Sequence, residues 1–150
     1  MEKTLVIIKP DGIKRGLAGE VISRFEKRGL KIIGLKMVWL SMEKAQQLYA
    51  PHKGKEFYQG LVSYMTSGPV VAMAVAGRGS IRIVRNMIGA LRLGESMPGS
   101  IRGDYSMDLR HNVIHGSDSP ENAERELAVF FSDGDFMDYS TCDEAVLYSE

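Results

Sequence analysis

The first regular segment of the chain reads Leu5-Val6-Ile7-Ile8-Lys9-Pro10-Asp11-Gly12. Its four apolar residues, three of which are β-branched, predict a buried strand. The Lys-Pro-Asp-Gly tetrapeptide that follows predicts that this strand ends in a turn. Because a buried strand needs neighbouring strands and covering helices, the remainder of the chain has to supply both.

Apolar patterns downstream of this strand supply those elements. We expect strands over 30–40, 70–76 and 113–114, and helices over 19–29, over 41–66 in two pieces, from a Ser80 cap to Leu91, and from Ser119-Pro120 onward. Residues 92–111 carry no convincing periodicity, which predicts a long functional loop. The order of elements indicates an α+β sandwich in which helices pack on one face of a mostly antiparallel sheet.

The composition is that of an ordinary globular protein, and the length of 150 residues predicts a single domain over 1–150. Hydrophobic residues make up 44% of the chain and charged residues 25%, which argues against intrinsic disorder. The 19 Lys plus Arg balance 19 Asp plus Glu, so the formal net charge is +0. This balance excludes a generic polyanion binder, but it allows an anion site built from a few local cations.

The sequence holds one cysteine, Cys142, which cannot form an internal disulfide or a cysteine-based zinc site. A single thiol is typical of a reducing compartment. The apolar run before Lys9 is too short for a signal-peptide core or a membrane span. We therefore expect a cytoplasmic protein with no membrane partner.

Two glycine-rich patterns that bind phosphate are missing from the sequence. Gly54-Lys55 is followed by Glu56 instead of Ser or Thr, and Gly77-Arg78-Gly79 does not continue into a dinucleotide-binding fingerprint. A nucleotide site in this protein would therefore use other residues.

The segment Asn112-Val113-Ile114-His115-Gly116-Ser117-Asp118-Ser119 places a histidine at the end of a short strand. Glu126 lies beside the apolar stripe of the following helix and needs a partner there. An N–H of His115 would serve, fixing the ring tautomer and leaving the other nitrogen free. Two alternatives stay open: a core histidine bound to a backbone carbonyl, and Glu126 paired with an Arg or Lys. His52 and His111 lack such a setting and are expected at the surface.

Four cations point to the same chemistry. Lys9 ends a buried strand, Arg82 and Arg85 are three apart on one helix, and Arg102 lies in the glycine-rich loop. Each of them alone is typical of a surface charge or a salt bridge. Together with an oriented histidine they indicate a phosphate site, because arginine makes forked contacts with phosphate, lysine supplies a point charge and histidine can act as a nucleophile.

The octapeptide around His115 resembles the active-site signature of the nucleoside diphosphate kinases. The likeness extends over nearly the whole chain, and further motifs keep the family's order and spacing: Ile8-Lys9-Pro10-Asp11-Gly12, Arg15-Gly16-Leu17, Ser67-Gly68-Pro69-Val70-Val71 and Pro98-Gly99-Ser100-Ile101-Arg102-Gly103-Asp104. The resemblance implies a ferredoxin-like β-α-β-β-α-β core with a four-stranded antiparallel sheet. It also implies an enzyme that transfers the γ-phosphate of ATP or another nucleoside triphosphate to a nucleoside diphosphate, in a ping-pong cycle through a phosphohistidine and with broad base specificity.

The resemblance also implies roles for matching positions. His115 matches the nucleophile, Glu126 the carboxylate that orients its ring, and Ser117 a hydroxyl that supports the pair. The positions matched to the substrate are Lys9, Arg85 and Arg102 for the phosphates, Tyr49 near the nucleophile, Asn112 and Lys9 for the ribose, Phe57 and Leu61 for the base, and Leu91 in place of a phosphate-binding threonine. Lys9 is also expected to be catalytic, because it offsets charge on the moving phosphate. Arg82 has no counterpart among these roles.

The expected cofactor is Mg²⁺, which arrives bridging the phosphates of the nucleotide, with no ligand from a protein side chain. The expected partners are ATP and other nucleoside di- and triphosphates. The resemblance further implies a homo-oligomer, with a hexamer favoured and a tetramer as the alternative, and it places the loop over 92–111 between subunits. No nucleic-acid partner is expected, because the net charge is zero and the sheet lacks interleaved aromatic residues.

One stretch departs from the family pattern. Leu91-Arg92-Leu93 stands where the family usually has Thr-Asn-Pro. Leu91 cannot donate the hydrogen bond that the threonine gives to phosphate, a loss of roughly 1.5–3 kcal/mol. We expect Arg92 to compensate with its own donors. The alternative is a nucleotide-binding or regulatory homologue with weakened catalysis.

Overall fold

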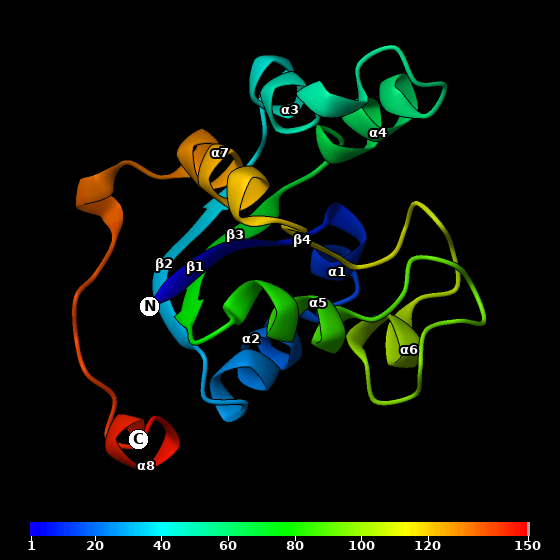
Figure 1. Cartoon of the computed structure of the whole chain (residues 1–150). Coiled ribbons are helices and arrows are strands. Elements are labelled where there is room, and N and C mark those ends of the chain that lie inside the picture. The colour runs from blue at the N-terminus through cyan, green and yellow to red at the C-terminus, as the bar shows by residue number, and fades with distance from the viewer. Residues whose placement is uncertain (150) are drawn as a thin grey trace.

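Four strands form one antiparallel sheet in the order β2-β3-β1-β4 (Figure 1). The computed structural model describes residues 1–149. The bounds of the strands are β1 (Glu2–Ile8), β2 (Lys31–Val38), β3 (Val70–Gly77) and β4 (Ile114–Gly116). The predicted four-stranded antiparallel sheet is therefore confirmed.

The helices complete the β-α-β-β-α-β order of the predicted core. Their bounds are α1 (Pro10–Lys14), α2 (Ala18–Lys27), α3 (Met42–Leu48), α4 (Tyr58–Met65), α5 (Ser80–Ile88), α6 (Ile101–Tyr105), α7 (Pro120–Phe130) and α8 (Glu144–Leu147), with short 3₁₀ turns at Ala50–His52 and Asp133–Asp135. The helices α2 and α5 follow β1 and β3, whereas α3 and α4 are inserted between β2 and β3. The two pieces predicted over 41–66 and the start at Ser119-Pro120 are confirmed.

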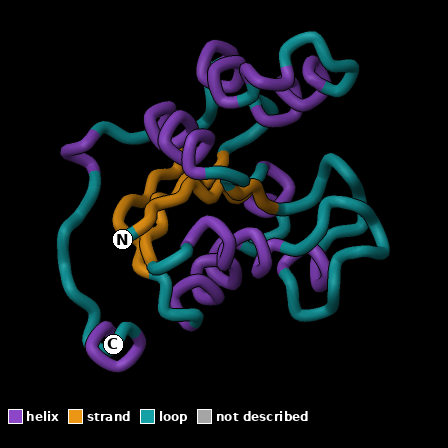
Figure 2. Tube along the Cα trace, viewed as in Figure 1, coloured by secondary structure: helices purple, strands orange, loops and turns teal. Residues whose placement is uncertain are grey.

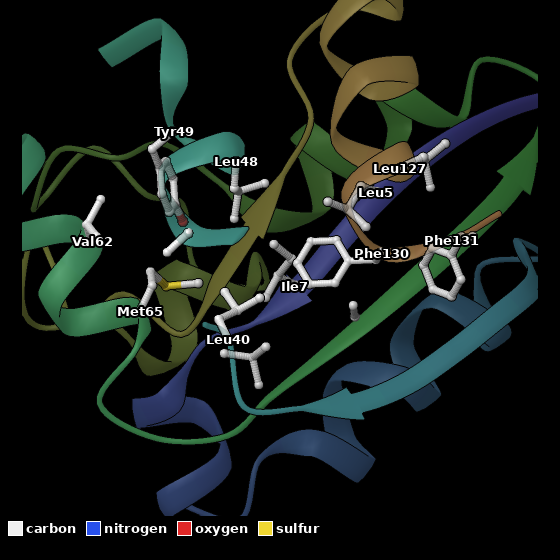
Figure 3. Packing of buried hydrophobic residues seen from close by; sticks show 14 of the residues in the cluster. Leu5, Ile7, Leu40, Leu48, Tyr49, Val62, Met65, Leu127, Phe130 and Phe131 are labelled. Carbon is white, nitrogen blue, oxygen red and sulfur yellow. The ribbon is translucent and has the colours of Figure 1, made fainter. Parts of the chain in front are cut away.

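Helices cover both faces of the sheet, so the prediction that they pack on one face is wrong (Figure 2). Leu5 and Ile7 of β1 pack with α3, α4 and α7, whereas Val6 and Ile8 pack with α2 and α5. Figure 3 shows the first of these clusters, to which α7 contributes Phe130. The reason is that β1 and β3 carry apolar residues on both of their faces, and each face needs cover.

The register of β1 and β4 places His115 on the face that α7 covers. Ile7 lies directly opposite His115 in the antiparallel ladder, and opposed residues point to the same face. On the other face, Gly116 approaches α5 so closely that an added Cβ would lie 2.6 Å from Cδ1 of Ile88. Strand β4, which carries His115, therefore pairs with β1 and lies between α7 on one face and α5 on the other.

Helix α5 begins and ends differently from the prediction. It ends at Ile88 instead of Leu91, because a glycine with positive φ follows. Ser80 is the first helical residue and not the cap, and its hydroxyl donates to the backbone carbonyl of Glu2 at 2.9 Å. The carboxylate of Glu2 accepts a hydrogen bond from the backbone N–H of Ile81 at 2.8 Å, so a residue of β1 serves as the cap.

Three shorter segments also differ from their predictions. The expected turn after β1 is the helix α1, which begins at Pro10 because proline fits the first helical turn. The loop predicted over 92–111 contains α6, which the hydroxyl of Ser100 caps by accepting a backbone hydrogen bond. The strand predicted at 113–114 begins at Ile114, because Val113 adopts φ 74°.

Within residues 1–149, no helix combines the length and the apolar composition that crossing a bilayer requires.

Candidate active site

His115 and Glu126 form the pair that the sequence predicts. Nε2 of the imidazole lies 2.5 Å from Oε1 of Glu126, whose side chain is buried. The ring therefore donates its Nε2–H to the carboxylate, and in a neutral imidazole this leaves the lone pair of Nδ1 available. The ring of Tyr49 stands nearly perpendicular to the imidazole, with 6.0 Å between ring centres, and restricts its rotation.

Lys9 lies at the junction of β1 and α1 and is almost fully buried. Burial, followed by the positive charge of Arg102, lowers the pKa of Lys9 to about 7, while the carboxylate of Asp11 acts in the opposite direction. An ammonium group that is buried beside another cation is stabilised by an anion. The surroundings of Lys9 therefore favour a negatively charged ligand.

Two arginines hold their guanidinium groups against the backbone near β4. Arg102 of α6 is buried and donates to the carbonyls of Ile114 at 2.8 Å and Gly89 at 3.3 Å. Arg85 of α5 is exposed and donates to the carbonyl of Gly116 at 3.3 Å. Burial and the charge of Arg85 lower the pKa of Arg102 to about 10. Because backbone acceptors carry no net charge, both guanidinium groups remain suited to phosphate.

The predicted residues converge on one cleft of about 620 Å³. Ten of the eleven line it: Lys9, Tyr49, Phe57, Leu61, Arg85, Leu91, Arg102, Asn112, His115 and Glu126. These ten residues join three cations and a histidine–carboxylate pair to apolar and aromatic side chains. A cleft of this size and mixed character fits a ligand that has both an anionic and a flat apolar part.

Asn112 leads into β4 and is buried. Its Nδ2 donates to the carbonyl of Leu109 at 2.9 Å, whereas its Oδ1 is buried without a hydrogen-bond partner among residues 1–149. A buried acceptor of this kind is stabilised by a ligand hydroxyl. Its predicted contact with the ribose stays a prediction.

Ser117 is the predicted site residue that does not line the cleft. Its backbone N–H donates to the carbonyl of Leu5 at 3.1 Å. Its hydroxyl is buried, and Oγ has no hydrogen-bond partner among the described residues. The described contacts therefore do not include the expected support of the histidine–carboxylate pair by this hydroxyl.

Sequence reasoning missed several lining residues. His52, expected at the surface, is half-buried and lines the cleft, where its ring packs on Phe57 with 5.2 Å between ring centres. Leu109 and Arg110 line the cleft from the loop before β4, and Arg125 lines it from α7. The sequence carries no distinctive signal for Leu109, because Leu93, Met97 and Met107 lie in the same loop, whereas adjacency to Glu126 was a signal for Arg125.

Two arginines named in the sequence lie outside the lining of the cleft. Arg82 is exposed, in keeping with its lack of a counterpart. Arg92 is also exposed, and its Nη1 faces Oε1 of Glu95 at 3.8 Å. Arg92 does not line the cleft in this structure, and the expectation that it replaces the threonine donor stays a prediction. His111 is exposed, as expected.

Comparison with known proteins identifies relatives of the chain. A family model described as nucleoside diphosphate kinase matches residues 2–136. The nucleoside diphosphate kinase of Archaeoglobus fulgidus is 51% identical over 150 residues, which cover 100% of this chain and 99% of that protein. The enzyme of Hyperthermus butylicus is 56% identical over 137 residues, which cover 91% of this chain and 96% of that protein.

Solved structures agree. A halophilic nucleoside diphosphate kinase from Halobacterium salinarum, in complex with CDP, matches with a TM-score of 0.95 and 45% identity over 99% of both chains. This likeness confirms the predicted ferredoxin-like fold. Enzymes of this family need a divalent cation. The chain therefore belongs to the nucleoside diphosphate kinase family and is an enzyme that transfers phosphate between nucleotides.

Proposed function

We propose that His115 is the nucleophile of a ping-pong cycle. Nδ1 attacks the γ-phosphorus of a nucleoside triphosphate, typically ATP, so that an N–P bond forms, the bond to the β–γ bridging oxygen breaks and ADP leaves. A nucleoside diphosphate then takes the phosphate from phospho-His115 by the reverse steps. The observation that carries this proposal is the contact of Nε2 with Glu126, because it occupies one ring nitrogen and leaves the other for attack.

Lys9, Arg85 and Arg102 bind the phosphate oxygens in this proposal. Phosphoryl transfer depends on positioning and on neutralising charge more than on covalent chemistry by the protein. The support is that all three cations line the cleft and that the two arginines bond to backbone carbonyls there, so the backbone fixes their positions. A bound phosphate would also raise the pKa of Lys9 from about 7 toward its ordinary value.

The divalent cation is Mg²⁺ in this proposal, carried by the phosphates of the nucleotide. The acidic residues on the described lining of the cleft are Asp118 and Glu126, and Glu126 already bonds to His115. The carboxylate of Asp118 accepts a hydrogen bond from Nδ2 of Asn122 at 2.7 Å, so this donor set suits a cation whose oxygen ligands come from phosphate and water. Bound there, the cation neutralises charge on the phosphate oxygens.

The apolar part of the cleft takes the base and Asn112 takes the ribose. Phe57 and Leu61 were matched to the base, and Leu109 adds a further apolar side chain to the same lining. Stacking on an aromatic ring accepts every base, because each base has a π-face. We therefore expect weak discrimination among nucleotides.

The enzyme is also proposed to be a homo-oligomer. A hexamer is favoured, and a tetramer is the alternative. β2 lies at the edge of the sheet, where alternate residues Leu35, Met37 and Trp39 are 54%, 63% and 67% exposed. An edge strand with a row of exposed apolar side chains is suited to contact with a second copy. Light scattering on the purified protein measures the subunit number.

Two further expectations are kept as proposals. Residues 1–150 form one domain, since both apolar clusters pack on the same sheet. The enzyme acts in the cytoplasm, since its single cysteine, Cys142, is an exposed free thiol of the kind that persists in reducing compartments.

An assay of phosphate transfer from ATP to GDP, in which the rate of GTP formation is measured, tests the proposed function. Wild-type protein is expected to turn over and His115→Ala to lose at least about 10⁴-fold in rate, because the covalent route is gone. His111→Ala, on an exposed ring, is the matched control and should keep the wild-type rate. Full activity in His115→Ala would rule out this nucleophile.

A second candidate is a nucleotide-binding homologue with weakened catalysis, and the observation that favours it is the apolar Leu91 on the cleft lining. It predicts micromolar binding of ADP by calorimetry together with negligible formation of GTP. Turnover comparable with that of other kinases would exclude it.

A further inference from the structure

The peptide that precedes β4 is strained. Among residues 1–149, Val113 is the one residue other than glycine that has a positive φ, and it is β-branched and fully buried. The N–H of Ile114 donates to the carbonyl of Asn112 at 2.9 Å, so Val113 is the middle residue of a tight γ-turn. With φ 74° this is the strained form of that turn, which persists only where surrounding contacts hold it.

Asp11 supplies one of these contacts. Its Oδ2 accepts a hydrogen bond from the backbone N–H of Val113 at 3.0 Å, across 102 positions of sequence. The backbone N–H of Lys9 donates to the backbone carbonyl of Val113 at 2.8 Å. The backbone N–H and the backbone carbonyl of Val113 are thus both bonded to the segment that joins β1 to α1.

The carboxylate of Asp11 is itself held in place. Its Oδ1 accepts a hydrogen bond from the hydroxyl of Tyr64, and its backbone N–H donates to that hydroxyl at 2.9 Å. Burial, followed by the hydrogen bond to Asp11, raises the pKa of Tyr64, so the hydroxyl stays a donor over the working pH range. Gly12 lets α1 approach the turn, since an added Cβ there would lie 3.0 Å from the carbonyl oxygen of Val113.

We propose that Asp11 is a positioning residue for phosphoryl transfer, whose carboxylate clamps the strained turn at Val113 and so sets where β4 presents His115. One residue, Ile114, separates Val113 from His115, and one residue, Pro10, separates Lys9 from Asp11. A change at the clamp therefore displaces His115 relative to Lys9, which lines the same cleft. The proposal rests on the proposed role of His115 as the nucleophile.

The rate at which saturating ATP phosphorylates His115 in a single turnover tests the clamp, because saturation removes effects on nucleotide affinity. Asp11→Ala removes the acceptor and is expected to slow phosphorylation about 100-fold, the size of effect that a displacement near 1 Å produces. Asp11→Asn keeps a carbonyl that can accept from Val113 and should recover part of the loss. Tyr64→Phe keeps the carboxylate of Asp11 but removes the hydroxyl that holds it, so a smaller loss of the phosphorylation rate is expected.

Asp135→Asn is the matched control. Asp135 also accepts a hydrogen bond from a backbone N–H, that of Ser132, but it lies on the far side of α7 in sequence and does not line the cleft. This variant should phosphorylate at the wild-type rate even if its melting temperature falls. Equal losses in Asp135→Asn and Asp11→Asn would reduce the effect of Asp11 to general stability and overturn the proposal.

A second readout, independent of transfer, is the NMR resonance of the Nε2–H proton that His115 shares with Glu126, read with the hydrogen exchange of the Val113 amide. In Asp11→Ala, which removes the acceptor, the amide of Val113 should exchange faster and the proton resonance should shift. Unchanged resonances, or a wild-type phosphorylation rate in Asp11→Ala, would overturn the proposal. If wild-type protein takes no phosphate, the proposed function fails, and these resonances alone decide whether Asp11 positions the ring.

Discussion

The two parts of the cleft differ in how firmly the fold holds them. Lys9, Arg102 and Glu126 are 6%, 6% and 4% exposed and are held by the sheet and by α7. Phe57 and Leu109, at the apolar part, are 46% and 58% exposed. Groups that we propose to handle the moving phosphate are thus held in place before a ligand arrives, whereas groups proposed for the base can adapt. The difference teaches why such an enzyme can be strict about the reaction and tolerant of the nucleotide.

Among changes to the residues that surround His115, loss of the buried carboxylate of Glu126 is expected to give the largest effect. Glu126→Gln removes the charge that orients and polarises the ring of His115, so single-turnover phosphorylation should fall about 10²- to 10³-fold. Glu124→Gln, an exposed change on the same helix, is the control and should keep the wild-type rate. Similar rates in both variants would show that the buried carboxylate of Glu126 does not contribute to the phosphorylation of His115.

The pH dependence of nucleotide binding sharpens the role of Lys9. Its pKa of about 7 in the free enzyme means that it is charged below pH 7 and loses its proton above. Because phosphate binds the charged form, the affinity for ADP should weaken as pH rises from 7 to 9, approaching about tenfold per pH unit. Calorimetry on the wild type and Lys9→Met checks this, since the variant should bind weakly with no such slope. A wild-type affinity that is flat over this range would contradict the assignment.

A smaller effect is expected at the exposed aromatic. Phe57→Ala should weaken the binding of ADP, GDP and CDP by a similar factor of about ten, because stacking contributes about 1–3 kcal/mol for any base. Met107→Ala, exposed and outside the lining of the cleft, is the control. A loss confined to one base would mean that this part of the cleft reads base edges after all.

The smallest effect is expected where the sequence departs from its family. Leu91→Thr restores a hydroxyl at the exposed rim of the cleft and should increase kcat/KM about tenfold, the lower end of the gain from one hydrogen bond to a charged group. Leu93→Thr changes an equally exposed leucine that does not line the cleft and should have no effect. Equal changes of kcat/KM in the two variants would show that the leucine at position 91 does not limit catalysis.

The sequence was sufficient where local pattern and chemistry agree. The apolar run before Lys9, the cap at Ser119 and the position of Glu126 beside the apolar stripe of its helix predicted a strand, a helix start and a buried pair that the structure contains. Each of these features depends on neighbours within a few residues or on a single long-range contact with a clear chemical need.

Other features depend on contacts that local pattern does not encode. The cap of α5 comes from Glu2, which lies 78 positions before Ser80, so the serine was wrongly taken as the cap. The strained turn at Val113 depends on Asp11, 102 positions away. Cover on both faces of the sheet required knowing that α3 and α4 fold back over it.

The most direct test of His115 as the nucleophile is the position of the phosphate after brief exposure to ATP. Phosphorus NMR on the base-stable phosphoenzyme distinguishes the two ring nitrogens of phosphohistidine. Since Glu126 occupies Nε2, the expected result is one phosphate per chain on Nδ1 of His115, removed on addition of GDP. A phosphate on Nε2 or on another residue would contradict it.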